Sequence, residues 1–174
     1  SSLVYPHPLT DRPLIMFSHP FKISILAAIC LVLSGCLSFG PLKYKQVQLL
    51  KKEGFVQTEE GWTLGLPERL LFDFDKSEVN PNHRNELVRL SNQLNKYGLH
   101  KLKVVGYTDN IGNTDYNIKL SQARAQSVAT IFVEQGFVRS NIQTIGRGAS
   151  QPLLPNTTEA NRAANRRVAI IIVP

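Results

Sequence analysis

Sulfur-containing residues are scarce in this sequence of 174 residues, which has only two cysteines, Cys30 and Cys36, and one methionine, Met16. Both cysteines lie within or directly after one N-terminal apolar run. We expect Cys30 to be removed together with that run, so that a single cysteine is left. The folded part of the chain is therefore predicted to contain no disulfide bond, even in an oxidising compartment.

The sequence also lacks the motifs of several common cofactor and catalytic sites. Gly106 and Gly112 do not form the Gly-x-Gly-x-x-Gly pattern of a dinucleotide cradle, and no Asp-x-Asp-x-Asp-Gly calcium loop is present. His83 and His100 have no serine or cysteine partner at a motif spacing, so no nucleophilic triad can be argued, and we expect both histidines at the surface. We predict no cofactor, no metal site and no catalytic residue.

One long apolar run is present, ISILAAICLVLSG at residues 23–35, and it follows a short segment that contains one lysine. This arrangement is typical of a secretory signal peptide, and the run is short for a membrane span. A buried helix or a retained anchor is the alternative. We predict a signal peptide over residues 16–35 and interpret residues 1–15, upstream of Met16, as upstream translation or a mis-set start.

The run ends in LSGC, residues 33–36, which resembles the lipobox of bacterial lipoproteins. In that family a lipid is attached to the cysteine and cleavage leaves it as the first residue, which implies lipidation of Cys36 and a tether over residues 36–43. Leu37 stands where the inner-membrane retention signal has aspartate, so the resemblance implies an outer-membrane anchor facing the periplasm. The net charge of +7 favours an anionic partner, and export argues against nucleic acid.

Helical and strand patterns alternate behind the tether. The predicted helices span residues 44–54, 80–98 and about 117–135. The predicted strands lie at residues 55–66 (two short strands), 69–72, 101–107, 141–146 and 167–173. A polar connection over residues 147–166 is expected to hold a helical turn near its end. This alternation predicts an α+β sandwich, with helices packed on one face of a small mixed sheet.

The motif LLFDFDKS, residues 70–77, is the strongest sign of an enzyme. An apolar strand followed by Asp-x-Asp-x-Ser resembles the first motif of haloacid-dehalogenase-type phosphatases, in which the first aspartate is the nucleophile and magnesium binds both. Such a site needs a later acidic pair. After Asp109 the only acids are Asp115, Glu134 and Glu159, which form no pair at a strand end. The remaining chain is also short for a phosphatase core, so we expect a protein that is not an enzyme.

The stretch GYTDNIGNTDYNIKLSQARA, residues 106–125, is preceded by LLFDFDKSEVNP and followed by NRRVAIIIV. Taken alone, Asp109 is typical of a turn and Arg124 of an exposed helix position. The three blocks in this order, over about residues 69–173, closely resemble the OmpA-type peptidoglycan-binding domain. The resemblance implies a βαβαβ(β) domain over residues 67–174.

In that family a loop aspartate and a helix arginine clasp the diaminopimelate of the peptidoglycan stem peptide, and those positions fall on Asp109 and Arg124. Diaminopimelate ends in an ammonium and a carboxylate on one carbon. A carboxylate accepts from the ammonium, whereas a planar guanidinium grips a carboxylate with two parallel hydrogen bonds. The other residues that the resemblance places at this peptidoglycan site are Thr108, Asn117, Phe74, Asp75, Lys76 and Arg166.

The segment before the domain, residues 44–66, contains the motifs EGF and EEGWTLGL. Within the superfamily these most resemble YfiB-type lipoproteins, which bind a small periplasmic repressor and so relieve inhibition of a membrane diguanylate cyclase. Leu50, Phe55 and Trp62 would then form an apolar patch for that partner; alternatively, they pack on their own domain. A purely structural tether between wall and outer membrane, as in Pal-like proteins, is the alternative function.

Overall fold

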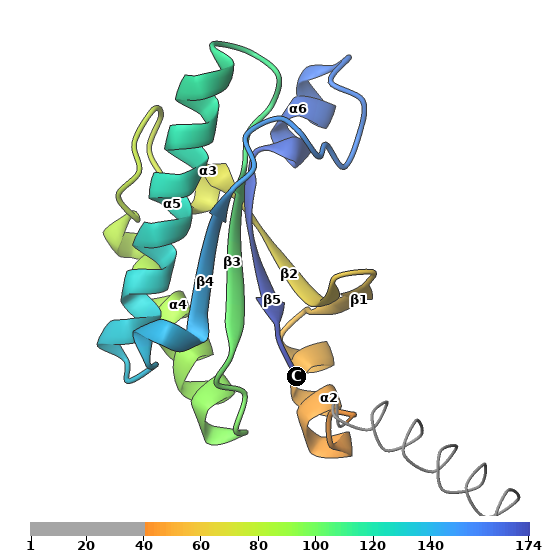
Figure 1. The fold of residues 1–174 in the computed structure, drawn as a ribbon, viewed down its shortest axis with the longest axis vertical. Coiled ribbons are helices and arrows are strands. Elements are labelled where there is room, and N and C mark those ends of the chain that lie inside the picture. Colours follow the sequence, from red (N-terminus) through yellow and green to blue (C-terminus); the bar gives the residue numbers. More distant parts are fainter. Residues whose placement is uncertain (1–40) are drawn as a thin grey trace, which may run out of the picture. The chain divides into compact units, whose positions relative to one another are not determined.

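A five-stranded sheet of order β1-β2-β5-β3-β4 forms the middle of the domain in the computed structural model, which describes residues 41–174 (Figure 1). The last strand, β5, lies between β2 and β3 and is antiparallel to both, whereas β3 and β4 are parallel. The C-terminal sequence block therefore reaches the centre of the sheet. The strands are β1 (Val56–Thr58), β2 (Gly61–Pro67), β3 (Leu102–Tyr107), β4 (Ile142–Gly146) and β5 (Arg167–Ile172).

Two long helices, α4 (Pro81–Lys96) and α5 (Thr114–Glu134), cover one face of this sheet (Figure 1). Asn80 and Asn113 begin them, because each side chain accepts a hydrogen bond from a backbone N–H of the first turn. The α+β fold predicted from the sequence is confirmed. The remaining helices are α2 (Tyr44–Lys52), α3 (Glu68–Leu71), the 3-10 helix η2 (Arg139–Asn141) and α6 (Glu159–Asn165).

The main hydrophobic core lies between the two long helices and the sheet. Leu94 of α4 and Phe132 of α5 are fully buried there against Val104 and Ile170 of the central strands. The other face of the sheet carries a smaller apolar cluster that includes Val105, Ala169 and Ile171. Residues 41–174 form one compact unit that contains both clusters.

The segment ahead of residue 67 belongs to the same core. Leu50 of α2 is 0% exposed and Phe55 is 3% exposed, and both pack with the core residues of α4 and β5. Trp62 packs against this core with part of its side chain exposed. The expectation that Leu50 and Phe55 form a partner-binding patch is therefore wrong for this conformation, because burying these apolar side chains leaves them no surface to offer.

Residues 69–72 differ from the predicted strand. Most of this stretch lies in the short helix α3, and Phe72 follows in an isolated bridge to Val79. Strand β2 ends at Pro67, which has no N–H to continue a hydrogen-bonded ladder. The next residue, Glu68, donates its N–H to the carbonyl of Arg166, and the chain turns there into α3. The turn brings Glu68 to the wall of a cavity that also includes Asp109 and Arg124.

The predicted signal peptide, residues 16–35, the upstream residues 1–15 and the lipidation site Cys36 lie outside the described residues. Of the tether, residues 36–43, the structure describes only the last three. No helix within residues 41–174 is both long and apolar enough to span a membrane.

Helix α5 touches the sheet at two glycines that are opposite each other in β3 and β4. A Cβ atom on Gly106 would lie 2.0 Å from the backbone oxygen of Ser121, and one on Gly146 would lie 2.5 Å from the backbone nitrogen of Gln122. These distances leave no room for a side chain. The absence of side chains at both positions therefore sets how closely α5, which carries Arg124, lies against the sheet.

We predict that Gly106→Ala lowers the free energy of unfolding by about 3 kcal/mol, because the added methyl group must push α5 away from β3. Gly65→Ala in β2 is the matched control, since a Cβ there meets nothing within 4 Å. Its effect should stay within about 0.5 kcal/mol. Urea denaturation of both variants measures the difference, and equal losses would contradict this account of the helix–sheet contact.

Candidate functional site

An open cavity of about 990 Å³ lies where strand β3 ends and helix α5 begins. Its walls come from the loop after α3, the loop after β3, the first half of α5, and α6, which Figure 1 shows together in the upper part of the domain. Segments far apart in the sequence thus share one site. The predicted binding residues that line the cavity are Asp109, Arg124, Thr108, Asn117, Phe74, Asp75 and Arg166.

The loop after β3 holds Asp109 in a defined position. This residue is 8% exposed, and its Oδ1 accepts a hydrogen bond of 2.9 Å from the backbone N–H of Ile111. The Thr108 hydroxyl donates to the Asp109 carbonyl oxygen at 2.8 Å, and the Asn117 amide of α5 donates to the Ile111 carbonyl at 2.9 Å. The side chains predicted from the family motif therefore build the loop as well as the cavity wall.

Arg124 is 3% exposed, although the sequence alone suggested an exposed helix position. Its Nε donates to the backbone carbonyl of Lys76 at 2.9 Å, whereas Lys76 is not among the residues that line the cavity. The guanidinium lies 5.0 Å from the centre of the Phe72 ring, and its Nη1 pairs with Glu68. Its Nη2 is buried and has no hydrogen-bond partner among the described residues. An unpaired buried donor is costly, so this nitrogen favours a ligand that brings an acceptor.

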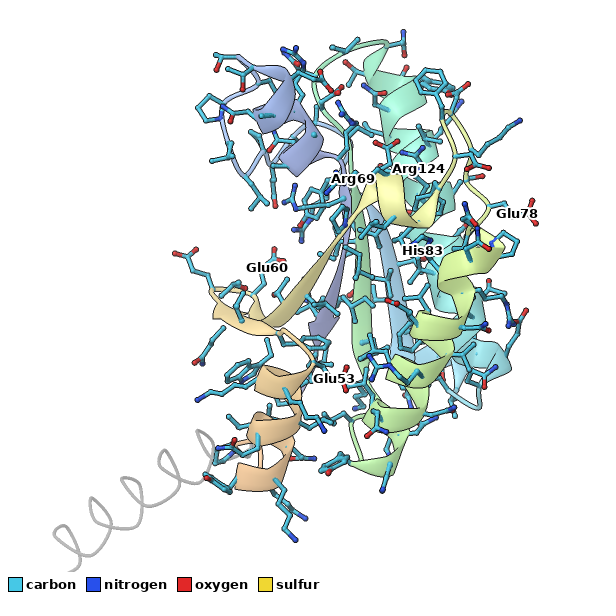
Figure 2. The ribbon with its side chains drawn as sticks, turned by 180° about the vertical axis from the view of Figure 1, so that it is seen from behind. Glu53, Glu60, Arg69, Glu78, His83 and Arg124 are labelled. Atoms are coloured by element: carbon cyan, nitrogen blue, oxygen red, sulfur yellow. The ribbon has the colours of Figure 1, made fainter. Side chains whose placement is uncertain are left out.

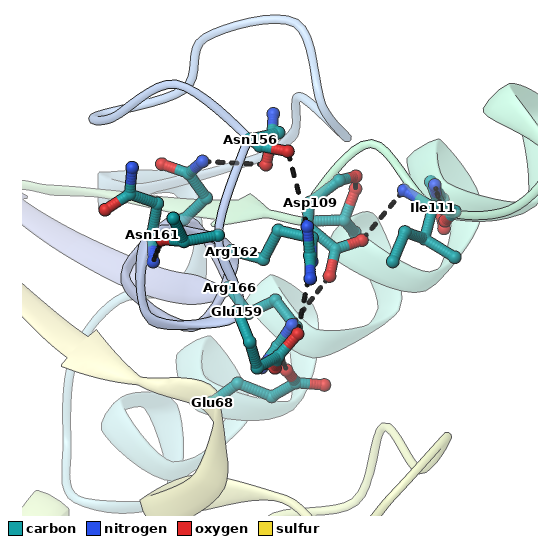
Figure 3. A network of polar contacts seen from close by, with 12 residues as sticks. Glu68, Asp109, Ile111, Asn156, Glu159, Asn161, Arg162 and Arg166 are labelled. Carbon is teal, nitrogen blue, oxygen red and sulfur yellow. Dashed lines mark hydrogen bonds and ion pairs between the residues drawn. The ribbon is translucent and has the colours of Figure 1, made fainter.

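Arg166 joins three carboxylates at the cavity (Figure 3). Its Nη1 donates to Asp109 Oδ2 at 2.7 Å, its Nη2 donates to Glu159 at 2.7 Å, and its Nε lies 3.0 Å from Glu68 Oε2. Hydrogen bonds from Arg166 and Arg162 lower the pKa of the Glu159 carboxyl, so it is ionised at neutral pH. Burial acts to lower the pKa of Arg166, but its bonds to Glu159 and Asp109 outweigh this and raise it.

Glu68 and Glu159 are site residues that the sequence analysis did not identify. Glu68 contacts both cavity arginines, Arg124 through Oε1 and Arg166 through Oε2. Figure 2 shows Arg124 beside α3, the helix that Glu68 begins. Glu68 lies just before the matched motif blocks, and Glu159 lies in the long polar connection. No spacing signal marks either residue; only the fold brings them to the arginines.

The loop after α3 is tied to α5 by an aspartate and a tyrosine. Asp75 has a φ of +58°, an uncommon conformation that aspartate tolerates better than most residues. Its carboxylate accepts a hydrogen bond from the Tyr116 hydroxyl, and this bond raises the pKa of the tyrosine. Phe74 is left 96% exposed at the cavity. The loop thus presents an aromatic ring at the rim, and Tyr116 is a further residue that the prediction missed.

The two aspartates of the phosphatase-like motif make other contacts. Asp73 accepts a bond of 3.4 Å from the Asn80 side chain, and Asp75 is bonded to Tyr116. Within residues 41–174, no group of three or more His, Cys, Asp or Glu side chains is placed to hold a metal ion. The described part of the chain therefore contains no cluster of carboxylates of the kind that the phosphatase hypothesis requires for magnesium.

The sequence model of the OmpA family matches residues 71–166, and the chain belongs to the OmpA family. It is 40% identical over 159 residues to the outer-membrane lipoprotein YfiB of Pseudomonas aeruginosa, a match that covers 88% of this chain and 95% of that protein. The predicted resemblance to this family, and to YfiB-type lipoproteins within it, is confirmed.

Two solved structures share the fold. The cell wall anchor of the T6SS from Pseudomonas aeruginosa matches with a TM-score of 0.61 and 25% identity, over 79% of this chain and 100% of that chain. The peptidoglycan-associated lipoprotein from Burkholderia pseudomallei matches with a TM-score of 0.52 and 26% identity, over 59% of this chain and 86% of that chain.

We predict that Glu68→Gln lowers the free energy of unfolding by about 1–3 kcal/mol, because two partly or fully buried guanidinium groups lose a shared carboxylate. Glu134→Gln is the control, since the Glu134–Arg84 pair is solvent-exposed on both sides. Its effect should stay below about 1 kcal/mol. Urea denaturation compares them, and an equally small loss at Glu68 would show that the carboxylate does not stabilise the site.

Proposed function

We propose that this protein binds peptidoglycan non-covalently through the diaminopimelate of the stem peptide, with Asp109 and Arg124 as the two recognition groups. The observation that carries the proposal is that both side chains line one open cavity, where Arg124 keeps a buried Nη2 without a partner among the described residues. The names of the two solved neighbours, a cell wall anchor and a peptidoglycan-associated lipoprotein, support the same class of ligand.

The chemistry of the two side chains suits the two charges of one amino-acid end. The Asp109 carboxylate accepts one bond at each oxygen from Arg166 and Ile111, and ionised carboxylates have about four acceptor positions in all. An ammonium group can use the remaining ones. The ligand carboxylate takes the free Nη2 of Arg124, in the low-dielectric wall where a charge-assisted bond is strong.

The site is largely ready before a ligand arrives. Arg124 is fixed by Glu68, Lys76 and Phe72, and Asp109 is fixed by Ile111 and Arg166. Such fixed groups lose little conformational entropy on binding. A ligand carboxylate that bonds both Nη atoms of Arg124 must share Nη1 with Glu68. This sharing influences how tightly the ligand carboxylate binds.

We further propose that cleavage before Cys36 leaves a lipidated cysteine and that the lipid holds the protein in the outer membrane, facing the periplasm. The lipobox-like ending of the apolar run supports this, as does the name of the P. aeruginosa relative, an outer-membrane lipoprotein matched over 88% of this chain. In this arrangement the protein joins the membrane to the wall without catalysing a reaction and without a cofactor.

Asp109→Asn and Arg124→Lys should each weaken the binding of a diaminopimelate stem peptide at least tenfold. Asp109→Asn removes the negative charge, and Arg124→Lys removes the planar guanidinium. Each of these groups makes a charge-assisted bond that contributes about 1.5–3 kcal/mol, and a tenfold loss of affinity corresponds to about 1.4 kcal/mol. Isothermal titration calorimetry measures the affinity, and circular dichroism checks the fold. Asp115→Asn is the matched control, since Asp115 is exposed in the first turn of α5 and is not part of the cavity wall.

Amidation of the ligand carboxylate tests the same contact without changing the protein. The amide removes the anion that Arg124 requires, so amidated peptide should bind the unchanged protein poorly. Arg124→Ala should bind the two peptides equally. If the unchanged protein shows equal affinity for both peptides, Arg124 stabilises the fold and does not recognise the ligand.

A second candidate function is capture of a small periplasmic repressor of a diguanylate cyclase, as in YfiB-type proteins. The observation that favours it is the length of the match to YfiB, which extends well beyond the family domain at residues 71–166. Of the three expected contact residues only Trp62 keeps an exposed part. Without such a partner the protein is a structural tether.

Trp62→Ala should abolish co-purification of the small partner from periplasmic extract, while binding to purified sacculi persists. Among the three residues expected to contact the partner, Trp62 is the one that keeps an exposed part, and the cavity lies on other residues. Parallel loss of partner capture and sacculus binding would show that Trp62 only supports the core.

A further inference from the structure

One end of the described domain carries exposed lysines that make no ion pair with any described carboxylate. Every ion pair within residues 41–174 is made by an arginine. We call these lysines the basic end. They belong to α2 and the residue before it, to the last turn of α4, and to the turn before β3. The members are Lys43, Lys45, Lys51, Lys52, Lys96 and Lys101.

Tertiary contacts bring these segments together. The side chain of Gln46 in α2 donates to the carbonyl of Tyr97, at the end of α4, at 2.9 Å. Figure 1 shows α2 and the C-terminal end of α4 at the lower end of the domain. Glu53, the acid that follows α2, is occupied by a two-pronged bond with Arg89, at 3.0 and 2.9 Å, so it does not neutralise the lysines.

The cavity lies at the other end of the domain, and its charges are arranged differently. There the carboxylates of Glu68, Asp109 and Glu159 are paired with arginines. Helix α5 runs from the cavity toward the lower end over 21 residues, or about 30 Å. The charges at the cavity end of the domain are therefore paired, whereas the positive charges at the α2 end are not.

The chain leading to the proposed anchor joins the domain at the basic end. Lys43 directly precedes α2, and a chain between residues 36 and 43 can span at most about 25 Å even when fully extended. Lipidation at Cys36 would thus keep α2 close to the membrane surface. Tyr44, which is 77% exposed beside Lys43 and Lys45, adds an aromatic ring of the kind that sits at membrane interfaces.

We propose that the basic end is an interaction surface for anionic phospholipid headgroups, which holds the domain against the membrane with its cavity directed away from it. The location rests on the proposed anchor at Cys36, but the surface is independent of diaminopimelate recognition. Lysines near an anionic membrane surface each strengthen binding by about fivefold, so several together supply an appreciable attraction that salt weakens.

Vesicle co-sedimentation tests this surface on residues 41–174, the compact unit that contains the described core and lacks the anchor. The protein should bind vesicles that contain phosphatidylglycerol, release them at high salt, and ignore pure phosphatidylcholine vesicles. Lys45→Glu should lower the affinity at least tenfold. Lys119→Glu is the matched control, because it makes the same charge change at an exposed position of α5, and it should change the affinity less than twofold.

Equal losses in the two variants would overturn the proposal, because binding would then follow net charge and not the basic end. Equal binding to both kinds of vesicle would overturn it as well. Sacculus binding, measured on the same variants, should be unchanged by Lys45→Glu. A protein that binds anionic vesicles but not sacculi would refute the proposed wall binding alone, so the two failures can be told apart.

Discussion

The carboxylate of Glu68 lies between two arginines that come from separate parts of the chain, Arg124 of α5 and Arg166 directly before β5. A guanidinium that is almost fully buried requires a counter-charge, since its desolvation is otherwise costly. Glu68 supplies that charge and extends the ion-pair cluster through Arg166 to Asp109. The cavity wall therefore depends on one side chain that lies outside every sequence motif.

Arginines and lysines have separate roles in this domain. The arginines make all of the ion pairs within residues 41–174, and one of them, Arg166, pairs with three carboxylates at once. A planar guanidinium with fixed donors suits such sites, whereas a strongly hydrated ammonium on a flexible stem suits a solvated surface. The exposed lysines of the basic end are thus left without an ion-pair partner among the described residues.

The helix–sheet contact connects stability to the site. Gly106 and Gly146 let α5 approach the strands, and Arg124 lies on that helix three residues after the contact at Ser121. Asp109 lies two residues after the end of β3. The positions of both proposed recognition groups therefore depend on the same close packing, so a change in that packing displaces them together.

The sequence by itself determined the alternation of helices and strands and both ends of α4, because capping residues are local signals, and its resemblance to the OmpA family pointed to Asp109 and Arg124. It placed the start of α5 near residue 117, whereas the helix begins at Thr114. It could not determine that residues 69–72 form a helical turn, that Leu50 and Phe55 are buried, or that Arg124 is buried beside Glu68. Those outcomes were decided by tertiary structure. Burial and ion pairing depend on which segments contact each other in the folded chain. The contacts among β2, α5 and β5 follow from the order of the strands in the sheet and from the packing of the helix on it, and no local sequence pattern encodes that order.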